Sequence, residues 1–161
     1  MKYELTGTIK ALLSEYKRAI VELIVVIKNL KGKEIISIRD NKTTDANCRS
    51  IQTILTHLVY AGYNYTNYIE NLSGIYKEVE PKKYLDNANK YVEALNGMFE
   101  YCENFFLAHP SISLEGKDNS QRITTHWGQL YDIEQLMEHA IVHILKHTKQ
   151  IERFITAQKE S

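Results

Sequence analysis

Cysteine is scarce in this sequence. The chain has 161 residues and two cysteines, Cys48 and Cys102, which stand far apart and form no Cys-x-x-Cys pair. Small secreted domains that lack a large core use closely spaced cysteines as a disulfide framework, and this chain has no such framework. Two unpaired thiols suit a reducing compartment, so the sequence predicts a cytoplasmic protein.

Excess charge and long apolar runs are lacking as well. Twenty basic residues balance twenty acidic ones, and no basic run is longer than two residues. Nucleic-acid binding depends on basic patches, so no nucleic-acid partner is expected. The most apolar run, residues 19–30, is short and carries Glu22 and Lys28. This run is too short and too polar to span a membrane, and it indicates a core helix.

Residues that interrupt helices are also few. The chain has two prolines and seven glycines, and its apolar residues recur at spacings of three and four, which is typical of amphipathic helices. A chain of this length is expected to form one domain, over residues 1–161. The sequence predicts an all-α four-helix bundle without paired strands, with helices at 8–30, 50–73, 81–109 and 129–158 and connections at 31–49 and 110–128.

Several residues predict where these helices begin. Ser50 is a suitable N-cap for the second helix, although Asp45 offers an alternative start one turn earlier. Pro81 is expected in the first turn of the third helix, where a missing N–H costs little. Asp132 is the predicted N-cap of the fourth helix, and Gln135 stands where a capping box needs it.

The fourth helix carries a histidine at every fourth position, namely His139, His143 and His147. Four residues advance about 40° around a helix, so the three imidazoles lie on one side of it. A single helical histidine is more often a surface residue or a hydrogen-bonded core residue. Three at this spacing, within an apolar segment, predict a metal-binding or catalytic role for at least two of them.

The second helix contributes one more histidine, His57. Alone it would be interpreted as a core residue, but its meaning changes if it faces the histidines of the fourth helix. Two ligands from the fourth helix and His57 would give three imidazoles and one open position, the layout of a catalytic zinc site. Nickel or iron could also occupy such a site.

Other metal sites are excluded by spacing. Ala140 follows His139, so the His-Glu-x-x-His motif of zinc proteases is absent. No glutamate stands three residues before any histidine, as a ferritin-like di-iron site requires. Ala61 occupies the position one turn after His57, where a hemerythrin-like site would need a carboxylate. A mononuclear site with histidine ligands remains.

Two motifs and an approach segment resemble the DinB/YfiT-like superfamily: Ser50-Ile51-x-x-Ile54-Leu55-x-His57, His143-x-x-x-His147-x-x-Gln150-Ile151, and Trp127-Gly128 before the fourth helix. The resemblance implies an up-down-down-up four-helix bundle that often forms a homodimer. By motif position, it implies a divalent metal ion on His57, His143 and His147. His139 is then additional, either a neighbour behind the ligands or an alternative ligand together with His143.

The resemblance also implies an activity, since family members with known reactions include thiol S-transferases. A thiol cosubstrate and an electrophile would then be the partners. A metal-dependent hydrolase, a non-enzymatic metal-binding or stress-related bundle, and a bundle whose histidines are purely structural are the alternatives. Candidates for orienting a substrate are Tyr60, Asn64 and Gln150, each one or two turns from a predicted ligand, although ordinary core-edge positions would explain them equally well.

Neither cysteine is expected to act as the nucleophile. Cys102 lies on the apolar stripe of the third helix, and Cys48 stands about two and a half turns before His57. No serine on the fourth helix is spaced to pair with His143 or His147. The nucleophile would therefore come from a metal-bound cosubstrate.

Overall fold

The computed structural model describes residues 5 and 7–160, and most of these residues are helical, which confirms the all-α class. The ends of the predicted domain, residues 1–4, 6 and 161, lie outside the described residues. The elements are α1 (Gly7–Ile27), α2 (Gly32–Ile36), η1 (Ala46–Cys48), α3 (Ile51–Asn71), α4 (Ala88–Ala108), η2 (Asn119–Gln121), β1 (Ile123–Thr124), β2 (Leu130–Tyr131) and α5 (Ile133–Lys159). In the described part of the chain, no helix is both long enough and apolar enough to cross a membrane.

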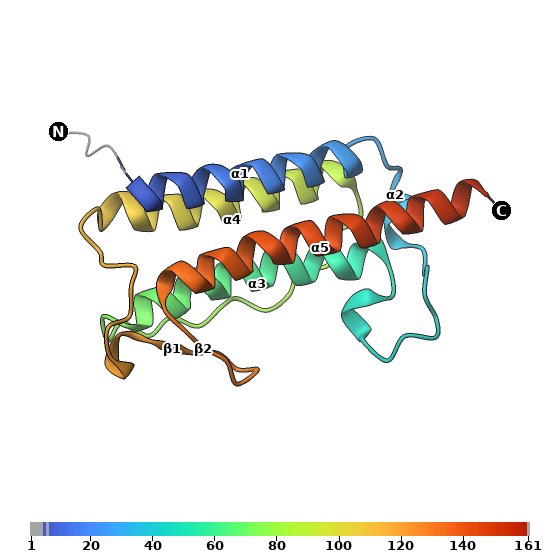
Figure 1. The fold of residues 1–161 in the computed structure, drawn as a ribbon. Coiled ribbons are helices and arrows are strands. Elements are labelled where there is room, and N and C mark those ends of the chain that lie inside the picture. The colour runs from blue at the N-terminus through green and yellow to red at the C-terminus, as the bar shows by residue number, and fades with distance from the viewer. Residues whose placement is uncertain (1–4, 6, 161) are drawn as a thin grey trace.

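The four long helices lie side by side (Figure 1). Helix α1 packs against α5 and α4, and α3 packs against the same two helices. In Figure 1, α1 and α5 run in one direction, whereas α3 and α4 run in the other. Each helix therefore contacts one parallel neighbour and one antiparallel neighbour.

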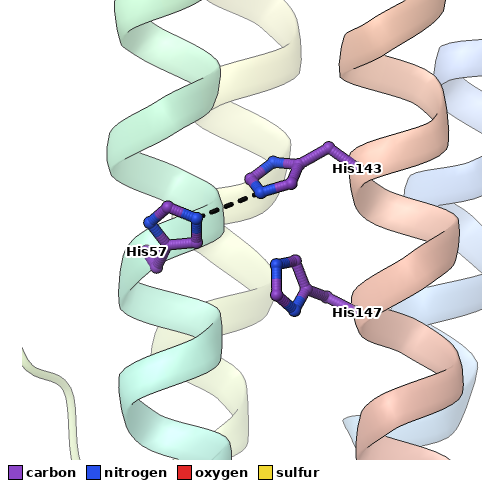
Figure 2. A group of neighbouring side chains, drawn as sticks. All are labelled: His57, His143 and His147. Carbon is purple, nitrogen blue, oxygen red and sulfur yellow. Dashed lines mark hydrogen bonds between the residues drawn. The ribbon is translucent and has the colours of Figure 1, made fainter. Parts of the chain in front are cut away.

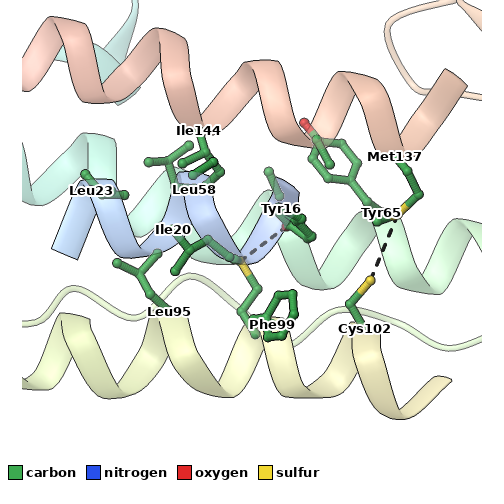
Figure 3. Packing of buried hydrophobic residues seen from close by; sticks show 14 of the residues in the cluster. Tyr16, Ile20, Leu23, Leu58, Tyr65, Leu95, Phe99, Cys102, Met137 and Ile144 are labelled. Atoms are coloured by element: carbon green, nitrogen blue, oxygen red, sulfur yellow. Dashed lines mark hydrogen bonds between the residues drawn. The ribbon is translucent and has the colours of Figure 1, made fainter. Parts of the chain in front are cut away.

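The core is formed by apolar side chains from all four long helices. Ile20, Leu58, Leu95 and Ile144 represent α1, α3, α4 and α5 in it, and each is almost completely buried (Figure 3). The hydroxyl of Tyr16 lies 3.9 Å from the sulfur of Met98, so this buried polar group has a partner. The amphipathic stripes of the sequence thus converge on a single interior.

The predicted helix starts at Ser50 and Asp132 are confirmed. The Ser50 side chain accepts a hydrogen bond from the backbone N–H of Thr53, at the N-cap of α3. Asp132 accepts from the N–H of Gln135, whose side chain accepts from the N–H of Asp132, so the capping box is present at α5. The alternative start at Asp45 belongs to a separate turn, because Asp45 caps η1.

The predicted start of the third helix at Pro81 is wrong. Helix α4 begins at Ala88, after Asn87, whose side chain accepts from the N–H of Lys90. Residues 74–87 form neither helix nor strand, and we call this segment the strap. The side chain of Gln52 donates to the carbonyl of Leu85, and this contact between distant residues holds the strap in an extended path. The predicted apolar stripe began at Tyr84 and Leu85, within the strap, but tertiary contacts overrode it there.

Two connections contain more structure than the sequence predicted. The segment 31–49 includes α2 and η1, and an isolated bridge pairs Ile38 with Ser50. Next to α5, strands β1 and β2 form an antiparallel pair in which Ile123 faces Tyr131. Two-residue strands are too short for an alternating pattern, so the prediction that no strands pair was wrong here.

Candidate metal centre

Three imidazoles from two helices meet at one point. His57 projects from α3 towards α5, and His143 and His147 project from successive turns of α5 (Figure 2). One nitrogen of each ring lies within 4.8 Å of the corresponding nitrogen of the others. The Nε2 atoms of His57 and His143 are 3.0 Å apart. The structure confirms that His57 faces the histidines of the fourth helix.

Buried neighbours hold these rings in place. Ile54 and Leu58 flank His57 on α3, and both are buried in the core. On α5, Ile144 and Thr148 are buried beside the two histidines. His147 is itself only 3% exposed, whereas His57 and His143 lie at the margin of the core. Packing of α3 against α5 therefore sets the distance between the rings.

The three imidazoles are neutral at pH 7. Burial, and after it the electrostatic effects of His147 and Lys82, lower the pKa of His57 to about 4. Burial and the adjoining histidines lower the pKa of His143 to about 3. The pKa of His147 is lowered mainly by burial as well. Neutral imidazoles keep the lone pairs that a metal ion needs, so the donor set fits a divalent cation.

Hydrogen bonds orient two of the rings. Nδ1 of His147 lies 2.8 Å from Oε1 of Gln150, an acceptor, so this nitrogen carries the proton and Nε2 keeps its lone pair. Nδ1 of His143 lies 3.2 Å from the hydroxyl of Tyr65. Metal-binding histidines are usually held through their second nitrogen in this way. Both contacts leave the inward nitrogens available to a shared ion.

Tyr65 was missed by sequence reasoning. It follows His57 by eight residues, so it lies two turns along α3 on nearly the same face. Its side chain is 6% exposed, and burial raises the pKa of its hydroxyl. A tyrosine in an apolar stripe resembles a core residue, and only its spacing from His57 offered a signal.

The three candidates for orienting a substrate occupy different positions relative to the histidines. The side chain of Gln150 is hydrogen-bonded to the ring of His147, a candidate metal ligand. Tyr60 lines a cavity whose walls include none of the three histidines. Asn64 is half-buried on α3, and among the described residues no hydrogen bond joins it to the site. Of these three candidates, Gln150 is the one that the structure places in hydrogen-bond contact with a ring of the group, that of His147.

His139 lies outside the group of three. Its ring stacks on Trp127 with centroids 5.0 Å apart, and on His143 with centroids 5.9 Å apart. Tyr65 meets it edge-on at 5.6 Å. The ring of His139 therefore lies between those of Trp127 and His143, and its role stays a prediction.

A short hairpin brings Trp127 to this position. The turn between β1 and β2 carries His126 and Trp127, and the hydroxyl of Tyr68 lies 3.0 Å from both the backbone nitrogen and Nδ1 of His126. Trp127 is 37% exposed although it packs against His139. The hairpin thus covers the end of the row of histidines on α5 at which His139 lies.

Cys48 is closer to the site than its position in the sequence indicated. Its sulfur lies 3.8 Å from Oε1 of Gln150, the atom that accepts from His147, and 3.4 Å from a carboxylate oxygen of Asp45. Burial raises the pKa of this thiol, so it stays protonated at neutral pH. Cys102 is buried in the core, which raises its pKa to about 12. Both cysteines are free thiols.

Comparison with known proteins adds no family assignment. No protein-family model matches the chain, and a search of characterised proteins finds no significant match. The functional interpretation therefore depends on the geometry and chemistry of the three histidines. Those residues support a coarse statement, which is that the chain brings together three histidines close enough to hold a metal ion.

Proposed function

We propose that this chain is a metal-dependent enzyme with a DinB/YfiT-like, up-down-down-up four-helix bundle. His57, His143 and His147 would hold one divalent ion, with zinc preferred and nickel or iron as alternatives. The observation that supports the proposal is the convergence of three neutral imidazoles within 4.8 Å. Without an ion, the two facing Nε2 atoms of His57 and His143 must share a single proton.

The reaction that suits this site best is S-transfer from a small thiol to an electrophile. A divalent ion bound by three neutral ligands keeps its positive charge and favours the thiolate form of a thiol. Gln150 and Tyr65 hold the rings of His147 and His143. The cosubstrate sulfur forms a new bond to the electrophilic carbon, the leaving group departs with its electron pair, and the thiol proton passes to solvent.

The protein's own thiols do not suit the role of nucleophile. Cys48 faces Asp45 and Gln150 rather than the three imidazoles, and its raised pKa keeps it protonated. Cys102 is buried beside Met137 in the core. The nucleophile is therefore assigned to a small-molecule cosubstrate, and a cytoplasmic location with a thiol pool fits this assignment.

A hydrolase is the alternative enzyme, because an ion with an open position also lowers the pKa of bound water. A non-enzymatic metal-binding protein would hold the ion and lack turnover with either substrate. The homodimer implied by the family resemblance stays a prediction, which the molecular mass in solution would test.

Metal content tests the ligand assignment. Protein purified without a histidine tag is expected to hold about one divalent ion per chain, since three imidazoles complete one site. His57→Ala and His147→Ala should each lower the occupancy well below that of wild type, measured by elemental analysis. His139→Ala is the matched control on the same stripe and should retain the ion.

Unchanged metal content in both ligand variants would refute the assignment. If His139→Ala lowers the occupancy most, His139 and His143 form the pair instead.

Turnover tests the assignment of the nucleophile. The double variant Cys48→Ala with Cys102→Ala should keep its activity with a small thiol and an activated aryl chloride, followed by absorbance. Chelation should abolish this activity, because the site would lose the ion. If the double variant keeps its metal and its fold but loses activity, a protein thiol performs the chemistry and the proposal is wrong.

A further inference from the structure

The strap, residues 74–87, is held at both ends by hydrogen bonds to its backbone. At one end, the side-chain amide of Asn67 donates to the carbonyl of Lys77 over 3.4 Å. At the other end, the amide of Gln52 donates to the carbonyl of Leu85 over 3.0 Å. Both donors come from α3. Between these two points the hydroxyl of Thr56, also on α3, donates to the carbonyl of Lys83 over 3.4 Å.

A cavity of about 480 Å³ lies between the strap and helices α3 and α4. Tyr60 and Tyr63 line it from α3, and Tyr91, Ala94 and Tyr101 line it from α4. The strap contributes the charged side chains of Glu78, Glu80, Lys82 and Lys83 to the same lining. The volume is within the range of small-molecule binding sites. Tyrosine rings offer flat apolar surface with a polar edge, so the walls suit an aromatic or aliphatic group.

The two adjacent lysines of the strap, Lys82 and Lys83, differ in burial and in their partners. Lys83 is exposed and pairs with the carboxylate of Glu80 at 2.8 Å. Lys82 is half-buried, and its ammonium lies 2.7 Å from the side-chain oxygen of Asn47 and 5.5 Å from the ring centroid of Tyr60. Among the described residues, no carboxylate pairs with Lys82. An ammonium has three donors, so Lys82 can still bind an anion.

We propose that this cavity binds a small organic acid. The apolar body of the ligand would lie against Tyr63 and Tyr101, and its carboxylate would accept a hydrogen bond from Lys82 at the cavity wall. A neutral ligand of the same shape would leave this cation without an anionic partner, so the charge supplies the selectivity. None of the three histidines lines this cavity, and binding there does not require a metal ion.

Calorimetric titration with 4-phenylbutyrate tests the proposal, and the neutral amide 4-phenylbutyramide is the matched probe. Wild-type protein should bind the carboxylate about tenfold more tightly than the amide, because only the carboxylate forms a charge-assisted hydrogen bond. Lys82→Met keeps the aliphatic part of the side chain and should remove this tenfold preference. Lys83→Met, on the same strap, should retain it.

A second variant tests the cavity itself. Ala94→Phe places a ring in the space and should abolish binding of both probes, while thermal unfolding reports whether the fold is kept. His57→Ala should leave the binding of 4-phenylbutyrate unchanged, so that failure of the metal site is distinguishable from failure of this one. The proposal is wrong if 4-phenylbutyrate does not bind at millimolar concentration, if acid and amide bind equally, or if Lys82→Met and Lys83→Met have equal effects.

Discussion

Gln150 shows how a contact at the scale of single residues changes an interpretation. Its position one turn after His147 suggested a residue that orients a substrate. In the structure its side-chain oxygen accepts a hydrogen bond from Nδ1 of His147. The same oxygen lies 3.8 Å from the sulfur of Cys48, which donates to it. An amide that fixes the tautomer of a candidate ligand would act on a bound metal ion rather than on a substrate.

Gln150→Leu should therefore weaken metal binding. Loss of the acceptor frees the His147 ring to rotate and to move its proton, and such changes behind a ligand cost about 10–100-fold in metal affinity. The measurement is competition with a coloured chelator of known affinity. Gln150→Glu retains an acceptor and should bind metal at least as well as wild type.

Cys48→Ser is the control for this variant, because it alters the other neighbour of Gln150 and leaves the bond to His147 intact. Wild-type metal affinity in Gln150→Leu, combined with lost turnover, would restore the substrate-orienting role that the sequence suggested.

At the scale of elements, the crossing of α3 and α4 depends on Gly62. A Cβ atom there would lie 1.9 Å from the sulfur of Met98, so this completely buried side chain would have to shift. The contact between these two helices therefore requires the absence of a side chain. Gly97 differs, because a Cβ atom at this position would lie 3.3 Å from the hydroxyl of Tyr63, at the end of a side chain.

Gly62→Ala should destabilise the protein by about 1–2 kcal/mol, since overpacking costs about 1–3 kcal/mol and the better helix propensity of alanine offsets part of it. Urea unfolding measures the change. Gly97→Ala is the matched control and should be close to neutral.

In a Met98→Ala background, Gly62→Ala should cost less, because the atoms that it meets are gone. Equal costs in the two backgrounds would show that the helix crossing does not depend on this contact.

For the molecule as a whole, the histidines link stability to pH. The pKa of His57 is about 4 and that of His143 about 3 in the folded chain, below the ordinary value of 6.5, because both rings are buried. As the pH falls below about 6.5, the unfolded chain takes up protons at these positions before the folded chain does. Acid therefore favours unfolding, and the loss of stability is complete only near the folded pKa values.

The free energy of unfolding of chelator-treated protein should consequently fall between pH 7 and pH 5. Carboxylates contribute to the same trend, so the informative comparison is with His143→Gln. This variant should lose less stability over the interval, by on the order of 1 kcal/mol, when urea unfolding is measured at both values. Parallel pH profiles for the two proteins would show that His143 is not held neutral by burial.

Much of this architecture follows from local chemistry that can be read along the chain. Capping depends on residues three apart, so Ser50 and Asp132 predicted the starts of α3 and α5 correctly. The spacing of His143 and His147 placed both rings on one side of a helix. These features depend on neighbours within a turn or two. Over that distance, the 3.6-residue repeat of the helix determines from the spacing in sequence which side each side chain projects from.

Features that depend on distant residues required the folded chain. The strap replaces the predicted first turns of α4, because Gln52, 33 residues earlier, binds its backbone. Cys48 reaches Gln150 across 102 residues, and Tyr65 reaches His143 across 78. A single sequence contains no periodic pattern that predicts contacts between residues so far apart in the chain. Their partners are determined by how α3 and η1 pack against the rest of the chain, where close packing brings distant side chains together.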